Sequence, residues 1–591
     1  MRSQTPISVL AGGCAGVALA VVGVSLALAL GIVPRPSLPV PVVGMGAGVG
    51  AAWAATRTLE SGPFRLGASL PPAGVIALVV ISGGGLGAVR ISLMVGGGIA
   101  AMVGPGILRP LARPFPRQAI AAGFILIAVV LVQTVIGGGA FGHDESAYLV
   151  KAGAWVHGLP TTGWGLHRGI GQSVLAAAIL PFTRAEEAYR LVAVVLALGT
   201  AGAVAWLGRT VHSNRVGIAA AAAFVAAPTF LRRGAEFLTD LPSTGILLVA
   251  TILLWRWLRA RRPRRSTLMW AAALAALAVY VRYQSVLTLG LLVVATVLGF
   301  WPRLREEKAA VVAAAGVAVA LLVPHFVFAL SATGSPWGII LETGAAGGRA
   351  YVGQGLVDYV ADFPDLLAGT LGAVAIVAGV GWIGVRVVHA ITQRDFADPA
   401  RLAIFLGFPA LGQIVALGLI SHGDPRFVFY PVALLITAGA IAADEVRRRI
   451  PASLYRAGVG GFVVACIAFV GINGDRVDRN AEARGGTLQV MVEAARTVRV
   501  ASLGAECGVL TGSLPQVTWY SGCPSAGFRR AEPLLAPEVG PNPYIILFDN
   551  GVRQPSGDLL AAYLAQTDGD PIVIESTGGL GDARLYLVGD G

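Results

Sequence analysis

Long apolar segments alternate with short polar stretches over most of this sequence. Each segment approaches the roughly 20 residues that an α-helix needs to cross a bilayer. The pattern predicts a mostly α-helical, polytopic membrane protein with about fifteen spans. The first run is too long for a signal peptide, so we expect an uncleaved helix. The predicted spans are residues 8–32, 38–56, 72–88, 91–108, 118–137, 187–208, 216–230, 241–257, 268–281, 284–300, 309–330, 366–387, 402–420, 427–443 and 453–472.

Arginines indicate how these spans are oriented. Six of them lie in or beside the loop that follows the span 241–257: Arg256, Arg259, Arg261, Arg262, Arg264 and Arg265. Short arginine-rich loops face the cytoplasm. Alternate counting from this loop puts the N-terminus on the cytoplasmic side, and Asp144, the 331–365 loop and the C-terminal tail outside. Residues 170–183 must then not cross, and their length predicts an interfacial or re-entrant helix.

The composition changes near residue 473, where charged residues return and the apolar runs shorten to strand length. Glycine and proline separate these runs, which predicts a small extracytoplasmic α/β domain. The predicted strands are residues 498–503, 544–548, 571–574 and 585–588, with a helix over 558–566. The expected domains are extra N-terminal helices at 1–117, a membrane core at 118–472 with outer loops 138–186 and 331–365, and the α/β domain at 473–591.

Two of the four cysteines, Cys507 and Cys523, lie in this outer domain. An oxidising compartment favours a disulfide between them, while two small buried thiols are the alternative. Cys14 and Cys466 lie in predicted spans, where cysteine acts as a small packing residue.

Composition supports the membrane assignment. Of 591 residues, 55% are hydrophobic and only 13% are charged, against about 25% charged in soluble domains. The mean hydropathy is +0.73. A net charge of +12 can indicate nucleic-acid binding, but here the arginines lie between apolar runs. We therefore expect membrane lipids, and not nucleic acid, as partners.

Two adjacent acids after the span 118–137 are the best candidates for chemistry. The segment from Phe141 to Gly158 reads FGHDESAYLVKAGAWVHG, in which Asp144 and Glu145 begin an amphipathic pattern. Its aromatic residues predict an interfacial helix at the outer surface. The acids either carry chemistry there or simply favour the helix N-terminus, where acidic side chains are common.

A second outer carboxylate, Asp240, follows a short loop with two arginines, Arg232 and Arg233. Asp240 either caps the next helix, which has a proline in its first turn, or faces a site.

Further cations are expected on the outer side. Arg282 and Tyr283 lie between two spans, and His422 and Arg426 belong to the stretch SHGDPRFVFYP. A guanidinium can bind phosphate through two hydrogen bonds, although an interfacial arginine can also simply extend to the membrane surface. The 331–365 loop adds Trp337, Glu342 and Tyr351, which suit either sugar stacking or headgroup anchoring.

Four segments occur in the order seen in the GT-C superfamily of membrane glycosyltransferases. They are FGHDESAYLVKAGAWVHG, GQSVLAAAILPFTRAEEAYRLVAVVLALG, FLTDLPSTGILLVA and HGDPRFVFYPVALLITAG. Over residues 118 to 445 the chain looks most like the protein O-mannosyltransferase and lipid A aminoarabinose transferase branch. The resemblance implies that Asp144 is the catalytic base with Glu145 beside it, and that Asp240 and Arg426 line the site. Residues 166–172 depart from the Lys-Pro-Pro-like stretch of that branch.

Such an enzyme takes its sugar from a polyprenyl phosphate at the outer face of the plasma membrane. Phosphate leaves as an anion, so the site needs one base and cations for the phosphate. Arg282, His422 and Arg426 suit that role, with Arg232 or Arg233. Direct displacement would invert the sugar, and the acceptor hydroxyl could belong to a protein, a glycolipid or a cell-wall glycan.

The sequence indicates no cofactor with certainty, and no His or Cys cluster has metal-ligand spacing. A Mg²⁺ or Mn²⁺ ion held by Asp144, Glu145 and Asp240 is compatible with their oxygen ligands. The alternative function is a transporter or lipid flippase without glycosyl transfer. Coupled transporters usually place acids near mid-membrane, whereas no predicted span here carries Asp or Glu near its middle.

Overall fold

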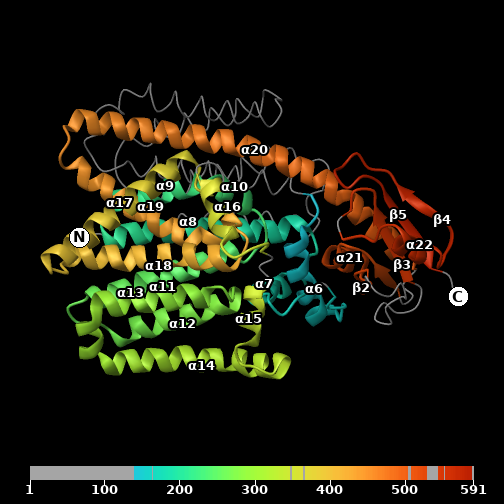
Figure 1. Cartoon of the computed structure of the whole chain (residues 1–591), viewed down its shortest axis with the longest axis horizontal. Coiled ribbons are helices and arrows are strands. Elements are labelled where there is room, and N and C mark those ends of the chain that lie inside the picture. Colours follow the sequence, from blue (N-terminus) through green and yellow to red (C-terminus); the bar gives the residue numbers. More distant parts are fainter. Residues whose placement is uncertain are drawn as a thin grey trace, which may run out of the picture.

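Apolar helices form the larger part of the computed structural model, and a small sheet forms its C-terminal end (Figure 1). The structure describes residues 139–588 apart from 163, 346–348, 364–366, 503–506, 529–542 and 552. The five predicted spans before residue 138, and with them the extra N-terminal helices and Cys14, lie outside the described residues.

The predicted spans of the described region correspond to helices. These are α8 (Glu186–Val211), α9 (Asn214–Val225), α10 (Pro228–Arg233), α11 (Asp240–Arg259), α12 (Arg265–Val281), α13 (Ser285–Glu306), α14 (Lys308–Thr333), α17 (Gly369–Gln393), α18 (Asp398–Ile420), α19 (Phe429–Arg447) and α20 (Ala452–Ala501). Within the described residues, seven helical segments are long and apolar enough to cross a membrane: α8, α11, α13, α14, α17, α18 and Pro425–Arg447. The expected count of about fifteen is therefore not confirmed.

One predicted span is divided in two. Residues 216–230 form α9 and the start of α10, because Pro228 occupies the first turn of a new helix. Proline lacks the backbone N–H that would continue the preceding helix.

Glycine allows two helices of the bundle to touch through their backbones. A Cβ at Gly379 of α17 would lie 2.3 Å from the Leu435 carbonyl oxygen, and one at Gly439 of α19 would lie 1.9 Å from that of Ala375. Small residues at helix crossings are typical of membrane bundles. In contrast, only 11% of the apolar window of α14 is buried, as expected for a helix that faces lipid.

Short elements form the end of the bundle that carries the acids. They are α6 (His143–His157), α7 (Gly171–Ile179), α15 (Gly338–Ala345), α16 (Gln354–Asp362) and the 3₁₀ helix η4 (Pro425–Val428). The nine residues of α7 extend over about 14 Å, which is too short to cross a bilayer, as predicted for 170–183. The 331–365 loop contains α15 and α16.

The C-terminal sheet has the strand order β2-β1-β3-β5-β4. Its strands are β1 (Gly508–Leu510), β2 (Ser525–Ala526), β3 (Pro543–Phe548), β4 (Thr567–Ile574) and β5 (Ala583–Val588), with helices α21 (Leu514–Ser521) and α22 (Asp558–Leu564). β1 pairs in parallel with β2 and β3, whereas β5 pairs antiparallel with β3 and β4. Three predicted strands and the predicted helix are thereby confirmed.

The predicted strand at 498–503 is wrong, because its described residues belong to the end of α20 or follow it. A short apolar run does not distinguish a strand from a helix end. The buried residues Met491, Ala494, Ala495 and Val498 recur at helical spacing, while Val500 is exposed. The 50-residue α20 also passes through residue 473 and runs from the bundle into the sheet domain (Figure 1).

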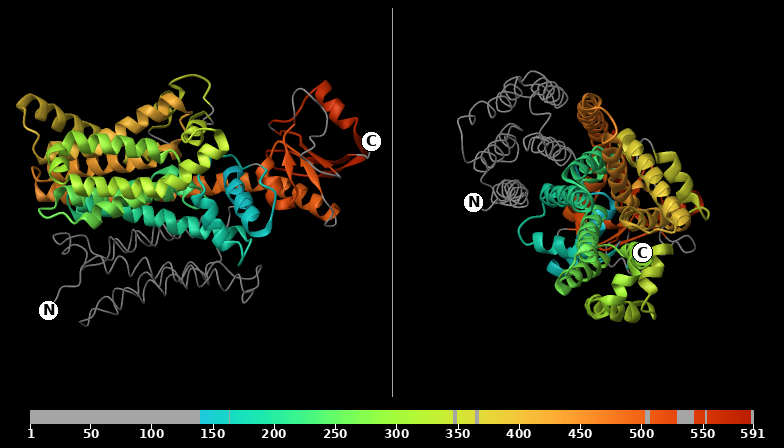
Figure 2. Two further views of the ribbon diagram at one scale, coloured as in Figure 1. Left: turned by 90° about the horizontal axis from the view of Figure 1, so that it is seen from below. Right: turned by 90° about the vertical axis from the view of Figure 1, so that its left-hand side faces the viewer.

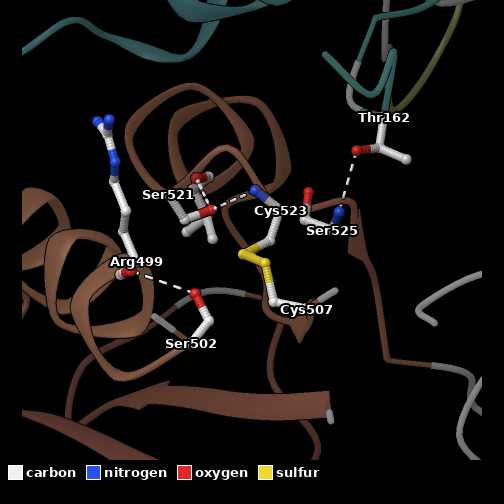
Figure 3. Close-up of a disulfide and its surroundings, with 8 residues drawn as sticks. Thr162, Arg499, Ser502, Cys507, Ser521, Cys523 and Ser525 are labelled. Carbon is white, nitrogen blue, oxygen red and sulfur yellow. Dashed lines mark hydrogen bonds between the residues drawn. A yellow bond between two sulfur atoms is a disulfide. The ribbon is translucent and has the colours of Figure 1, made fainter. Parts of the chain in front are cut away.

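A disulfide joins Cys507 and Cys523, which confirms the first of the two alternatives for this pair. It connects the chain just before β1 to the segment between α21 and β2 (Figure 3). Nearby, the backbone N–H of Ser525 donates to the Thr162 hydroxyl at 3.0 Å. The disulfide therefore lies where the sheet domain contacts the segment between α6 and α7.

Candidate active site

The N-terminus of α6 is anchored by Glu145. Its Oε2 accepts from the N–H of Gly142 at 2.9 Å, and its Oε1 accepts from the N–H of Phe237 at 2.9 Å. Arg190 lies 3.5 Å from the same carboxylate, which is only 1% exposed. Glu145 therefore ties α6 to the chain just before α11, and the helix-capping interpretation applies to this acid.

Asp144 points to the other side and meets two arginines. Arg168 Nη2 lies 3.0 Å from its Oδ1, and Arg426 Nη1 lies 2.9 Å from its Oδ2. The Asp144 side chain keeps 29% of its surface exposed. One carboxylate thus joins three segments that are distant in sequence: α6, the loop before α7 and η4.

Arg168 and Arg426 favour the ionised form of the Asp144 carboxylate. Burial alone would raise its pKa, but the charges of Arg426 and Arg168 and their hydrogen bonds hold the pKa of Asp144 well below its ordinary value. Burial and the charge of Arg168 lower the pKa of His167. A neutral His167 can accept a hydrogen bond, and Arg168 Nη1 lies 3.1 Å from its Nε2.

Arg426 is itself held in place by a second carboxylate. Its Nε lies 2.9 Å from Asp424, whose other oxygen accepts from the Arg426 backbone N–H at 3.1 Å. Arg233 approaches Asp424 at 3.7 Å and pairs with Glu236 at 2.6 Å. The predicted Arg233 and Arg426 are therefore in one network.

Asp240 and Arg282 form a neighbouring ion pair. Asp240 is the first residue of α11, and Thr239 before it makes no side-chain capping hydrogen bond. Arg282 Nη1 also lies 3.4 Å from the Thr239 hydroxyl, which is 3.3 Å from the hydroxyl of Tyr148 on α6. Asp240 is 4% exposed, so it faces the polar cluster and not solvent.

The ring of Phe427 contacts both groups of ions. The guanidinium of Arg282 is 5.0 Å from the ring centre, and that of Arg426 is 5.5 Å away. His422 meets the same ring at 5.3 Å. Asp144, Arg168, Asp240, Arg282 and Arg426 therefore belong to one polar cluster at one end of the bundle, and we call it the Asp144 cluster.

Arg232 is exposed. Four other predicted residues lie apart from this cluster, of which Tyr283 is buried against His325 at 4.9 Å. Trp337 packs on Phe326, whereas Glu342 and Tyr351 are exposed. No hydrogen bond or ion pair joins Tyr283, Trp337, Glu342 or Tyr351 to the Asp144 cluster within the described part of the chain.

Arg168 was not predicted as a site residue. It lies in the 166–172 stretch, where the Lys-Pro-Pro-like motif was expected, and that position was the available signal. Gly169 fixes the loop, because a Cβ there would lie 2.3 Å from the Val281 carbonyl oxygen. Only glycine permits this approach, which brings Arg168 close to the end of α12 and so to Arg282.

The described residues hold no group of ligands for a divalent cation. Across the described residues, no three His, Cys, Asp or Glu side chains gather where they could hold a metal ion. Both oxygens of Glu145 accept backbone N–H groups, and those of Asp144 face guanidiniums. The metal site imagined from Asp144, Glu145 and Asp240 is therefore not formed.

Comparison with known proteins gives a fold and no sequence family. No protein-family model and no curated protein sequence matches the chain. The crystal structure of ArnT from Cupriavidus metallidurans bound to undecaprenyl phosphate has a TM-score of 0.57 at 14% identity, over 78% of this chain and 97% of that chain. Its apo state has the same score and coverage at 13% identity. The oligosaccharyltransferase of Archaeoglobus fulgidus aligns at a TM-score of 0.47 and 14% identity, over 78% and 72% of the two chains.

The match to ArnT shows that this chain shares its fold. ArnT is the structure with the higher TM-score, and the chain is similar to it over nearly the whole ArnT length. Together with the seven apolar helices of the described region, this fold supports a multi-pass membrane protein.

Proposed function

We propose that this protein is a membrane glycosyltransferase that moves a sugar from a polyprenyl phosphate to a hydroxyl acceptor at the outer face of the membrane. The observation that carries the proposal is the pairing of Asp144 with Arg168 and Arg426 at one end of a bundle of apolar helices. The shared fold with ArnT, which was solved bound to undecaprenyl phosphate, supports it.

The reaction needs one proton acceptor. The acceptor hydroxyl attacks the anomeric carbon, and the bond from that carbon to the phosphate oxygen breaks. The leaving phosphate takes the electron pair, so no general acid is required, while the hydroxyl proton passes to Asp144. Attack opposite the leaving group inverts the anomeric configuration.

Arginines have two successive roles in this scheme. In the unliganded protein they hold the pKa of Asp144 low, which makes it a weak base. A phosphate that accepts hydrogen bonds from Arg168 and Arg426 would draw these charges away from Asp144. The pKa of Asp144 then rises, so the base becomes stronger when the donor is bound.

The remaining polar residues position the reactants. Glu145 has no free oxygen for the reaction and fixes the helix that carries Asp144. Arg282 lies beside the same Phe427 ring as Arg426 and suits a second phosphate oxygen. His422 and Arg233 lie at the edge of the same network and orient the donor.

Purified protein in proteoliposomes, supplied with a polyprenyl phosphate labelled in its sugar, tests this function. Transfer predicts label in the acceptor fraction and an equal amount of free polyprenyl phosphate, together with an inverted product. A transporter or flippase would instead move intact donor between leaflets without releasing polyprenyl phosphate. That second outcome would overturn the proposal.

Orientation has its own test. The arginine distribution predicts that the Asp144 cluster faces the outside of the cell. A single cysteine at exposed Arg232 should react with an impermeant thiol reagent added to intact cells, and one at exposed Arg261 should not. The reverse pattern would contradict the outer-face assignment.

A further inference from the structure

A second polar site lies at the other end of the bundle. Helix α11 begins at Asp240 in the Asp144 cluster and ends at Arg259; its 20 residues span about 30 Å. Arg259 lines a cleft of about 270 Å³ together with Phe300, Pro302, Arg303, Glu306 and Arg401. Three arginines in one cleft, far from the proposed chemistry, call for a separate explanation.

A break in α13 opens this cleft. Phe300 has non-helical backbone angles, φ −138° and ψ 25°, and Pro302 follows inside the helix. Proline removes a helical hydrogen bond and clashes with the preceding turn. The last residues of α13 therefore turn away from the helix axis, which carries Arg303 and Glu306 to the rim.

Two of the three arginines have carboxylate partners. Arg259 pairs with Asp398. Arg303 lies 3.6 Å from Glu306, and its Nη2 donates to the Ala260 carbonyl oxygen at 2.6 Å. The positive charge of these two residues is thus largely compensated.

Arg401 differs from the other two. Among the described residues its guanidinium makes no ion pair or hydrogen bond; it lies 6.0 Å from the centre of the Phe300 ring, and its charge acts on the Asp398 carboxylate without pairing with it. The Nε groups of both Arg401 and Arg303 are buried without a hydrogen-bond acceptor in the part of the chain that the structure describes. Hydrogen-bond donors without an acceptor on a positively charged group favour the binding of an anion. The planar guanidinium matches the geometry of a phosphate.

The surroundings indicate a lipid as the source of the phosphate. Trp301, next to Phe300, is 54% exposed, and exposed tryptophans mark the membrane interface. The same helix also exposes the apolar side chains of Val293, Val297 and Leu298. An acyl chain can therefore follow α13 while its headgroup reaches the cleft.

We propose that this cleft binds the phosphate of an anionic phospholipid from the leaflet opposite the Asp144 cluster. Arg401 is the main ligand and Arg303 the second. The site involves binding alone and is independent of the proposed glycosyl transfer.

The test is lipid retention by the purified full-length protein, measured by native mass spectrometry. Phosphatidylglycerol should remain bound at one molecule per protein, and phosphatidylcholine should not. Removing a charged hydrogen bond weakens binding by about tenfold or more, so Arg401→Gln should lose phosphatidylglycerol by that factor. Arg261→Gln, at an exposed arginine of the adjacent loop, is the matched control and should retain it.

Three results would overturn the proposal: equal retention by Arg401→Gln and wild type, equal retention of the two lipids, and displacement of phosphatidylglycerol by millimolar inorganic phosphate. The last result would assign the cleft to free phosphate.

Arg401→Lys keeps the charge but loses the planar donor fork, so it should show intermediate retention. If Arg401→Gln does not fold, lipid-dependent thermal stabilisation of the wild-type protein decides the question. Greater stabilisation by phosphatidylglycerol than by phosphatidylcholine supports the site, and equal stabilisation contradicts it.

Discussion

At the scale of single residues, two adjacent acids have opposite environments. Glu145 is 1% exposed and saturated by backbone N–H groups, whereas Asp144 is partly exposed and faces two guanidiniums. Adjacent positions at a helix start diverge by about 100° around the axis. This rotation separates an acid that holds the helix from an acid that can meet a substrate.

Arg426 should be needed for donor binding. Arg426→Ala removes one of the two guanidiniums beside Asp144, and a lost charge-assisted hydrogen bond corresponds to about tenfold or more in affinity. Binding of a radiolabelled polyprenyl phosphate to protein in nanodiscs measures the effect. Arg256→Ala, at an exposed position near the far end of α11, is the control, and equal affinities of the two variants would remove Arg426 from the phosphate site.

Arg168 should control the acidic limb of the pH profile. The pKa of Asp144 lies below its ordinary value because Arg426 and Arg168 outweigh its burial. Arg168→Gln removes one charge, so the pKa rises toward the ordinary value of about 3.9. The acidic limb of kcat/KM, which reports the free enzyme, then moves to higher pH. Arg184→Gln, at an exposed arginine outside the cluster, should leave the limb in place, and an unshifted limb in Arg168→Gln would contradict the account.

At the scale of elements, α6 is positioned from several directions. Glu145 ties it to the chain before α11. On its other side, the N–H of Phe141 donates to the Tyr520 hydroxyl of α21 at 2.8 Å, and that hydroxyl donates to Glu186 of α8 at 3.0 Å. The start of α6 is thus fixed by both the helical bundle and the sheet domain.

Replacing Glu145 should therefore loosen α6 without removing the base. In Glu145→Gln only one side-chain oxygen remains to accept the two backbone N–H groups. A buried donor left without a partner costs about 1–3 kcal/mol, so the Tm in detergent falls and transfer slows. Glu187→Gln, at an exposed acid in the first turn of α8, is the control. A wild-type Tm in Glu145→Gln would contradict the anchoring role.

At the scale of the whole molecule, the sheet domain lies at the same end as α6 (Figure 2). Its Tyr520 bonds the residue Phe141 just before α6, and its Thr518, at 2.9 Å, and Ser525 bond Thr162 in the segment after α6. The domain therefore supports the Asp144 cluster from outside the bundle.

The disulfide should stabilise that support. A bridge that closes a loop with a sequence separation of 16 contributes about 3 kcal/mol. Cys507→Ser with Cys523→Ser should lower the Tm and reduce transfer, because α21 then holds Phe141 less firmly. The control is Cys466→Ser, which removes a free thiol. An unchanged Tm and rate in the double variant would show that the contact does not depend on the bridge.

Much of this organisation could be predicted from the sequence. The lengths of the apolar runs predicted the membrane helices from residue 186 onward. The acidic segment 141–158 pointed to Asp144, which lies at the centre of the polar cluster. The partners were harder to predict, because pairing of Asp144 with Arg168 depends on how a glycine loop packs against α12. Tyr283 and Trp337 have the same side-chain chemistry whether they line a site or pack against neighbours, so sequence could not place them.

The most direct test of the central claim is the single-turnover rate of transfer at saturating donor in Asp144→Asn. Donor binding should persist, because Arg168 and Arg426 remain and lose a competing partner. The chemical step should slow by about 10²- to 10⁴-fold, the usual contribution of a general base. Asp398→Asn, at the opposite end of the bundle beside Arg259, should transfer normally. A rate near wild type in Asp144→Asn with donor bound would contradict the assignment of Asp144 as the base.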